Sequence, residues 1–261
     1  SDGKETISAP ILYAFGQGKA GQTYVFEVQG KLHESRISFY NEINGLDLTL
    51  GATREVPQTL IEAIGRPMSS IDVKDCFSCH ATAAVSDTKL QLDKMTLGVT
   101  CEGCHGPGEN HIIAMKSGSK ANKQIVNPGH FNADGQTEFC GSCHRTWSQV
   151  QLMRIRGVAN VRFQPYRIFG SKCYDIEDKR IGCVTCHDPH QQTKQTAVFY
   201  DSKCLACHSA NAKDVARLVQ CRVGKENCAS CHMPKYELPG SHFKFTDHRI
   251  RVVRPNDPYP D

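Results

Sequence analysis

A five-residue pattern, Cys-x-x-Cys-His, occurs six times in the 261-residue chain. It is the attachment signal for c-type haem, in which both thiols bond the porphyrin and the histidine ligates the iron. The six copies use twelve of the fourteen cysteines, so only two cysteines are left for any other role. The predicted attachment cysteines are Cys76, Cys79, Cys101, Cys104, Cys140, Cys143, Cys183, Cys186, Cys204, Cys207, Cys228 and Cys231, and the predicted proximal ligands are His80, His105, His144, His187, His208 and His232.

Paired cysteines also have other uses, which this pattern does not favour. Two Cys-x-x-Cys pairs can close a four-thiolate zinc site, but zinc leaves the histidine after every pair unexplained. Histidine is 12 of 261 residues, so six chance occurrences have odds of roughly one in 10^8. Thioredoxin-like redox pairs need neither the histidine nor six copies, and no C-x2-C-x2-C run for an iron–sulfur cluster is present. We therefore predict six haem c groups.

Six further histidines lie outside the motifs, one for each predicted haem. A haem iron has two axial positions, and the motif histidine fills only one of them. The equal counts predict bis-histidine ligation, which lacks the methionine ligand that raises the reduction potential. The predicted distal ligands are His33, His111, His130, His190, His242 and His248, with His33 and His130 included on the count alone.

Two of these histidines follow a motif closely. His111 comes six residues after His105, and His190 three residues after His187. Such a short segment cannot easily carry a ligand around its own macrocycle to the opposite face. We expect each of the two to ligate a neighbouring haem, which would join the haems into a connected stack.

The elements that hold these groups are expected to be short. Hydrophobic residues make up 39 % of the chain, with one tryptophan, so six apolar macrocycles should replace much of an ordinary core. We predict a multihaem cytochrome c fold with a haem-stacked core, short α-helices, long loops and little regular secondary structure. Residues 1–72 form a small β-rich N-terminal region without haem motifs, and residues 73–261 form the hexahaem region.

Local patterns place a few elements. Alternating residues around Gln29-Gly30-Lys31 predict a β-hairpin, and Leu46 to Leu50 predict a second short strand between two glycines. Helical spacing of apolar residues predicts helices over Thr146 to Ile155 and Asn211 to Gln220.

The charge of the chain is no sign of a nucleic-acid partner. Its formal value is +4, but a ferric bis-histidine haem brings about −1, so six haems lower the total to roughly −2. No basic run marks a nucleic-acid patch, and no apolar run approaches the ~20 residues of a transmembrane helix. The chain opens without a signal peptide, so we expect a mature form. Because c-type haem is attached outside the bacterial cytoplasm, we expect a periplasmic or extracellular protein.

Several longer segments resemble one family. CEGCHGPGENH, CGSCHR, RFQPYR followed by SKC, CVTCHDPH, CASCHMPK and the final FTDHRI are similar to multihaem c-type cytochromes related to the nitrifier tetrahaem electron carrier. That group also includes hydroxylamine oxidoreductase and pentahaem nitrite reductase, and the match covers roughly residues 76–254. The resemblance implies electron transfer through haems packed in stacked and perpendicular pairs. It also implies that His111, His190, His242 and His248 are distal ligands.

Three hypotheses follow. The first is an electron-transfer protein with redox protein partners and no bound substrate. The second is an enzyme in which one haem keeps an open position for nitrite, hydroxylamine or nitric oxide; no Cys-x-x-Cys-Lys motif supports it. The third is a homo-oligomer or filament in which the haem chain continues between subunits, with His33 as a ligand to a neighbour.

Four other residues have weaker signals. Cys173 and Cys221 are left over from the motifs, and in an oxidising compartment we expect them to form a disulfide. Arg162 and Arg167 in RFQPYR could hold haem propionates, because arginine binds carboxylates bidentately, or could be ordinary surface arginines.

Overall fold

The computed structural model describes residues 3–86, 89–118, 124–176, 180–209 and 221–261. The chain forms two compact units. Unit 1 comprises Ser1–Val126 and Glu237–Phe243, and unit 2 comprises Asn127–Tyr236 and Lys244–Asp261. The first two haem motifs belong to unit 1 and the other four to unit 2. Along the chain, the division between the units therefore follows the second motif. The division at residue 72 between a region without haem motifs and a hexahaem region stays a prediction.

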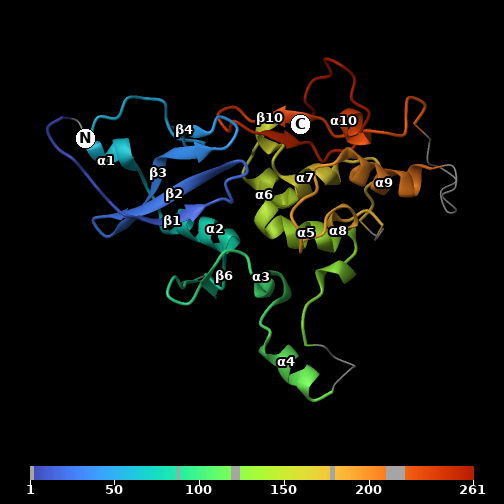
Figure 1. Cartoon of the computed structure of the whole chain (residues 1–261), viewed down its shortest axis with the longest axis horizontal. Helices are drawn as coiled ribbons and strands as arrows, with labels where there is room; N and C mark the ends of the chain where they lie inside the picture. The colour runs from blue at the N-terminus through green and yellow to red at the C-terminus, as the bar shows by residue number, and fades with distance from the viewer. Residues whose placement is uncertain (1–2, 87–88, 119–123, 177–179, 210–220) are drawn as a thin grey trace. The chain divides into compact units, whose positions relative to one another are not determined.

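A five-stranded antiparallel sheet opens unit 1 (Figure 1). Its strands follow the order β1-β2-β3-β4, and β5 pairs with the N-terminal part of β3. The strands are β1 (Ile11–Phe15), β2 (Gly21–Val28), β3 (Lys31–Tyr40), β4 (Gly45–Leu48) and β5 (Gly65–Pro67).

The hairpin predicted around Gln29-Gly30-Lys31 is confirmed. Val28 of β2 pairs with Lys31 of β3, and Gln29 and Gly30 both have positive φ angles, 52° and 74°. Two such residues in succession are what a two-residue hairpin turn requires, because its twist then matches that of the strands.

The second predicted strand is also present, with shifted ends. β4 begins at Gly45 and ends at Leu48 rather than Leu50. Beyond the strand, Thr49 still contacts β3, because its amide donates to the Arg36 carbonyl at 2.8 Å and its hydroxyl to the Ser35 carbonyl at 2.6 Å. Two residues later Gly51, at φ 90°, turns the chain away.

Helix α2 (Ser70–His80) carries the first motif and packs on this sheet. A capping box between Ser69 and Asp72 starts it. Phe77 is 1 % exposed and meets the rings of Tyr13 and Phe15 edge-on, at centroid distances of 4.8 and 5.1 Å. The apolar face of the sheet thereby fixes the helix that ends in His80.

The rest of unit 1 consists of short elements. Helix α1 precedes β5, and four two-residue strands, α3 and α4 follow α2 (Figure 1). Their bounds are α1 (Leu60–Ile64), β6 (Ala81–Thr82), β7 (Val85–Ser86), β8 (Lys89–Leu90), β9 (Thr96–Leu97), α3 (Cys101–His105) and α4 (Glu109–Lys116).

Unit 2 is built mainly from short helices. They are η1 (Pro128–His130), α5 (Ala133–His144), α6 (Trp147–Leu152), η2 (Gly157–Asn160), α7 (Gln164–Phe169), α8 (Cys183–Cys186), α9 (Ala197–His208) and α10 (Cys228–His232). The strands β10 (Lys235–Glu237) and β11 (Lys244–Thr246) come near the C-terminus. Short helices and small sheets agree with the prediction of little regular secondary structure.

The helix predicted over Thr146 to Ile155 is shorter than expected. Thr146 is the N-cap of α6, in a capping box with Gln149, and the helix ends at Leu152. It cannot continue because Arg154 has a φ of 51°, outside the helical region. The helix predicted over Asn211 to Gln220 lies outside the described residues. Within the described ranges, no helix is long and apolar enough to cross a membrane.

Candidate haem-binding sites

Each predicted haem motif lies on a helical turn. It ends α2, α5 and α9, it makes up the whole of α3 and α10, and in α8 the two cysteines are helical and the histidine follows directly. On a helix, residues i, i+3 and i+4 share one face. The two thiols and the imidazole of a Cys-x-x-Cys-His unit are therefore presented together, which is what attachment to one porphyrin requires.

Motifs three and four are in contact in unit 2. Helices α5 and α8 pack together, and Gln136 of α5 accepts a hydrogen bond from the Val184 amide at 3.2 Å. The sulfurs of Cys140 and Cys183 are close enough to hydrogen-bond to each other. Haems attached at these cysteines would consequently be neighbours.

Motifs four, five and six also lie on helices that contact one another. The sulfur of Cys186 in α8 lies close to that of Cys204 in α9, and Cys204 approaches Cys228 of α10. Asp201 of α9 caps α10, because its carboxylate accepts from the Asn227 and Cys228 amides at 2.6 and 2.8 Å. The start of the sixth motif is thus fixed by the helix that carries the fifth.

The two motifs of unit 1 flank the same strand. Strand β6 contacts both α2 and α3. The Thr82 hydroxyl of β6 accepts a hydrogen bond from the Thr100 amide at 2.9 Å, directly before Cys101. His80, at the end of α2, packs edge-on against Phe15 at 5.2 Å between ring centroids.

Four histidine rings are held by a backbone carbonyl. Nδ1 of the motif histidines His105 and His232 lies 2.7 and 3.0 Å from the carbonyls of Val126 and Arg251. A carbonyl can only accept, so Nδ1 carries the proton and Nε2 keeps its lone pair, the state that binds a metal. Two predicted distal ligands share this arrangement, His33 with Lys31 at 2.9 Å and His248 with Thr246 at 3.0 Å.

The other predicted distal ligands differ in which ring nitrogen has a polar contact and in the partner of that contact. His190 is exposed, and its Nδ1 lies 3.2 Å from the Asp188 carboxylate. In His242 it is Nε2 that meets a carboxylate, Asp47, at 2.7 Å, and this hydrogen bond is the main cause that lowers the pKa of Asp47. Nε2 of His130 lies 3.3 Å from the Asn127 amide nitrogen, and His111 lies in α4.

His33 is buried within the sheet. It is 4 % exposed and stacks on Phe26, with 5.9 Å between ring centroids and 11° between planes. Its neighbour Leu32 packs against the apolar cluster around α2, and successive strand residues point to opposite faces. His33 therefore points away from the helix of the first motif.

His248 and His187 face each other in unit 2. Their ring centroids are 6.0 Å apart. Burial, opposed by the hydrogen bond to Thr246, lowers the pKa of His248 to about 4, so the ring is neutral near pH 7. Two imidazoles bound to one metal by nitrogen–metal bonds of about 2 Å have a similar separation.

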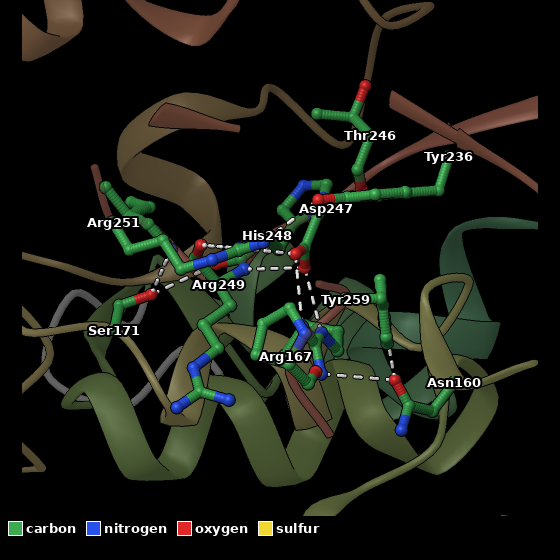
Figure 2. Close-up of polar contacts among 12 residues, drawn as sticks. Asn160, Arg167, Ser171, Tyr236, Thr246, Asp247, His248, Arg249, Arg251 and Tyr259 are labelled. Atoms are coloured by element: carbon green, nitrogen blue, oxygen red, sulfur yellow. Dashed lines mark hydrogen bonds and ion pairs between the residues drawn. The ribbon is translucent and has the colours of Figure 1, made fainter. Parts of the chain in front are cut away.

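A buried ion pair fixes the segment that contains His248 (Figure 2). Asp247 is fully buried, and its carboxylate accepts from Arg167 Nε at 2.8 Å and Nη2 at 3.1 Å. Arg251 adds a third contact at 2.6 Å, and the Arg251 carbonyl is the one that holds His232. One carboxylate thus anchors both a predicted distal ligand and the partner of a proximal ligand.

The expectation that Arg167 holds a propionate is wrong. Its guanidinium is occupied by Asp247, by Asn160 at 3.2 Å and by the Pro260 carbonyl at 2.9 Å. Asp247 was not among the predicted site residues, since its partner Arg167 is 80 positions away and no local pattern marks such a pair. Arg162, in contrast, has a buried Nε that finds no hydrogen-bond partner among the described residues. An orphaned N–H beside the third motif fits a cofactor that brings carboxylates.

The predicted disulfide is absent. Cys173 and Cys221 are both free. Cys173 lies half-buried near Cys204 and Cys207 of the fifth motif, whereas Cys221 is exposed and accepts hydrogen bonds from the Val223 and Gly224 amides. The two thiols therefore have different neighbours.

One glycine within a motif is required by packing. A Cβ on Gly141 would lie 2.6 Å from the Thr146 methyl carbon and 3.1 Å from its Cα. We expect Gly141→Ala to lower the free energy of unfolding by about 1–3 kcal/mol through overpacking, measured by chemical denaturation of the haem-loaded protein. Ser142→Ala, at the exposed neighbouring position, is the control and should change it by less than about 0.5 kcal/mol. Equal effects of the two substitutions would contradict this account.

Comparisons with known proteins find sequence similarity to cytochromes c. A model of the family described as cytochrome c554 and c-prime matches residues 52–106, which include the first two motifs. The high-molecular-weight cytochrome c of Nitratidesulfovibrio vulgaris (Hildenborough) is 26 % identical over 200 residues, 62 % of this chain and 32 % of that protein. The chain is a multihaem c-type cytochrome. Its haem-binding character therefore rests on relatives as well as on the motifs.

Two further proteins are similar to this cytochrome, one in sequence and one in an alignment of structures. The dissimilatory sulfite reductase MccA of Wolinella succinogenes is 27 % identical over 194 residues, 58 % of this chain and 24 % of that protein. The crystal structure of the outer cell wall cytochrome OcwA aligns with 81 % of this chain and 48 % of that chain, at 16 % identity and a TM-score of 0.37. The cytochrome spans about a third and a quarter of the lengths of its two curated relatives.

Proposed function

We propose that this cytochrome transfers electrons through a chain of six covalently bound, bis-histidine haems and binds no substrate at iron. The observation that best supports this proposal is a series of helix contacts, from α5 to α8, from α8 to α9 and from α9 to α10. These contacts bring four consecutive haem motifs side by side. Haems attached to adjoining helical turns are close enough for rapid electron exchange.

Distal ligation is supported best for His248. Its Nδ1 is anchored, its Nε2 is available, and its ring lies 6.0 Å from that of the motif ligand His187. We propose that these two rings bind the same iron, that of the haem attached at Cys183 and Cys186. His33, His111, His130, His190 and His242 remain proposed ligands whose haems are not assigned.

Mass and spin state test this function. Protein matured in a host competent for cytochrome c assembly should carry six haem masses, and its oxidised EPR spectrum should contain only low-spin iron. Carbon monoxide should not bind the reduced protein, because no axial position is open. Fewer than six haem masses, or an intense high-spin signal with carbon monoxide binding, would refute the six-haem, bis-histidine assignment.

A second candidate function is reduction of a small oxyanion or nitrogen compound at one open haem. Similarity to a dissimilatory sulfite reductase favours it, and so does the occupation of Nε2 in His130 and His242 by Asn127 and Asp47. A high-spin haem that binds sulfite, nitrite or hydroxylamine in the spectrum of the isolated protein would select this function over simple electron transfer.

Location and partners follow from the proposed chemistry. Covalent haem attachment favours the periplasm or the cell exterior, and electrons must be exchanged with other redox proteins. Assembly into a filament remains an alternative. His33 does not favour it, because a side chain that is 4 % exposed has little surface to offer a neighbouring subunit.

A further inference from the structure

Arg162 carries a buried N–H group that no atom of the described residues satisfies. Its Nε has no hydrogen-bond partner, and its guanidinium lies over the Phe163 ring, 5.0 Å from the centroid. An unsatisfied buried donor costs about 1–3 kcal/mol, and more when it is charged. An acceptor that reaches this N–H in the fully assembled protein would remove that cost.

The surroundings of Arg162 are positively charged. Burial lowers the pKa of its guanidinium, and the charge of Arg145 lowers it further. Arg145 directly follows His144 and caps α5 with a φ of 66°, a left-handed conformation that is uncommon for residues with a Cβ. None of the ion pairs among the described residues includes Arg162. Two neighbouring cations beside the predicted iron ligand His144 favour an anion at this position.

Arg167 shows that the chain can satisfy a buried arginine by itself. That guanidinium has Asp247, Asn160 and the Pro260 carbonyl as partners. For Arg162, five residues earlier, no atom of the described residues accepts a hydrogen bond from Nε. Because the described residues supply no acceptor for this Nε, we expect a group bound to the protein to supply it.

We propose that Arg162, with Arg145 beside it, binds a propionate of the haem attached at Cys140 and Cys143. This inference rests on the proposed haem attachment at the third motif. Each haem brings two carboxylates, and a guanidinium binds a carboxylate through charge-assisted hydrogen bonds. The positive charges also favour the reduced state of this haem, because they offset the negative charge that reduction adds.

The test is a redox titration of the haem-loaded Arg162→Gln variant. The midpoint potential of one haem should fall by at least the equivalent of a tenfold change in its reduction equilibrium, which is 59 mV for one electron. That potential should also become dependent on pH between about 5 and 7, because a carboxylate without its cation binds a proton more readily. Arg162→Lys keeps the charge and should show a smaller shift.

Arg156→Gln is the matched control. Arg156 is exposed and contacts Gln151 Oε1 at 3.3 Å, so its replacement removes the same charge at the surface and should leave every haem potential unchanged. If the glutamine variant does not mature, Arg162→Met, which also removes the charge, decides by the same measurement. Potentials of the Arg162 variants equal to those of the control would overturn the proposal.

Two further outcomes separate the competing explanations. If millimolar phosphate or sulfite shifts a haem potential in the wild type but not in Arg162→Gln, the site binds a soluble oxyanion and the propionate proposal is wrong. If mass spectrometry finds no haem lost from Cys140→Ser/Cys143→Ser relative to the wild type, the third motif carries no haem. The proposed function is then wrong at this motif. A fully loaded protein without a shift refutes only the propionate contact.

Discussion

Replacing Asp247 with alanine is expected to lower the free energy of unfolding by about 3–5 kcal/mol. The substitution leaves the charge of Arg167 buried, at 2 % side-chain exposure, without its carboxylate. It also removes the contact that holds Arg251, whose carbonyl accepts the Nδ1 proton of His232. Chemical denaturation of the haem-loaded protein, followed by far-UV circular dichroism, measures the loss.

Two variants make the Asp247 experiment specific. Asp257→Asn removes a carboxylate at an exposed position, where it caps the Arg254 amide, and should cost less than about 1 kcal/mol. The double variant Arg167→Met/Asp247→Leu should recover most of the stability, because the deeply buried charge of Arg167 is removed together with its partner. If the double variant is as unstable as Asp247→Ala, packing rather than the charge explains the effect.

The same ion pair sets a pH dependence of stability. Burial opposes ionisation of Asp247, but the hydrogen bonds and charge of Arg167, with the Arg249 amide and Arg251, outweigh it and lower the pKa. A carboxyl group whose pKa is lower in the folded than in the unfolded protein stabilises the fold above its ordinary value of about 3.9. This stabilisation is lost as the pH falls through the folded-state pKa. Asp247→Asn should flatten the acid limb of the stability curve.

Replacing His248 with alanine is expected to convert one low-spin haem to high spin and to create one carbon monoxide site. His248 is the predicted distal ligand whose Nε2 is available and whose ring lies 6.0 Å from that of His187. Loss of one imidazole leaves an axial position open on a single iron. Quantitative EPR of the oxidised protein and carbon monoxide titration of the reduced protein measure the change.

Removal of individual haems identifies the iron. In a Cys183→Ser/Cys186→Ser background, which lacks the fourth haem, His248→Ala should add no high-spin signal. In a Cys204→Ser/Cys207→Ser background, which lacks the fifth, the signal should remain. The opposite pattern would assign His248 to another haem, and an unchanged spectrum in every background would show that it is no ligand.

Local signals in the sequence were enough for the motifs and a few elements. The spacing of Cys-x-x-Cys-His dictates a shared helical face, and each copy lies on a helical turn. The Gln29-Gly30 turn was predictable because only neighbouring residues set its geometry. The helix over Thr146 to Ile155 was overestimated, because apolar spacing gave no sign of the left-handed Arg154.

Long-range contacts were decided only by the tertiary structure. Arg167 looked like a propionate ligand in RFQPYR, but Asp247, 80 residues away, occupies it, which leaves Arg162 as the orphaned arginine. The leftover Cys173 and Cys221 suggested a disulfide, yet they have separate surroundings. The sequence by itself determined what chemistry the chain carries, since covalent attachment depends on local spacing. Which histidines, arginines and carboxylates meet depends on how distant segments pack, so only the folded chain decides it.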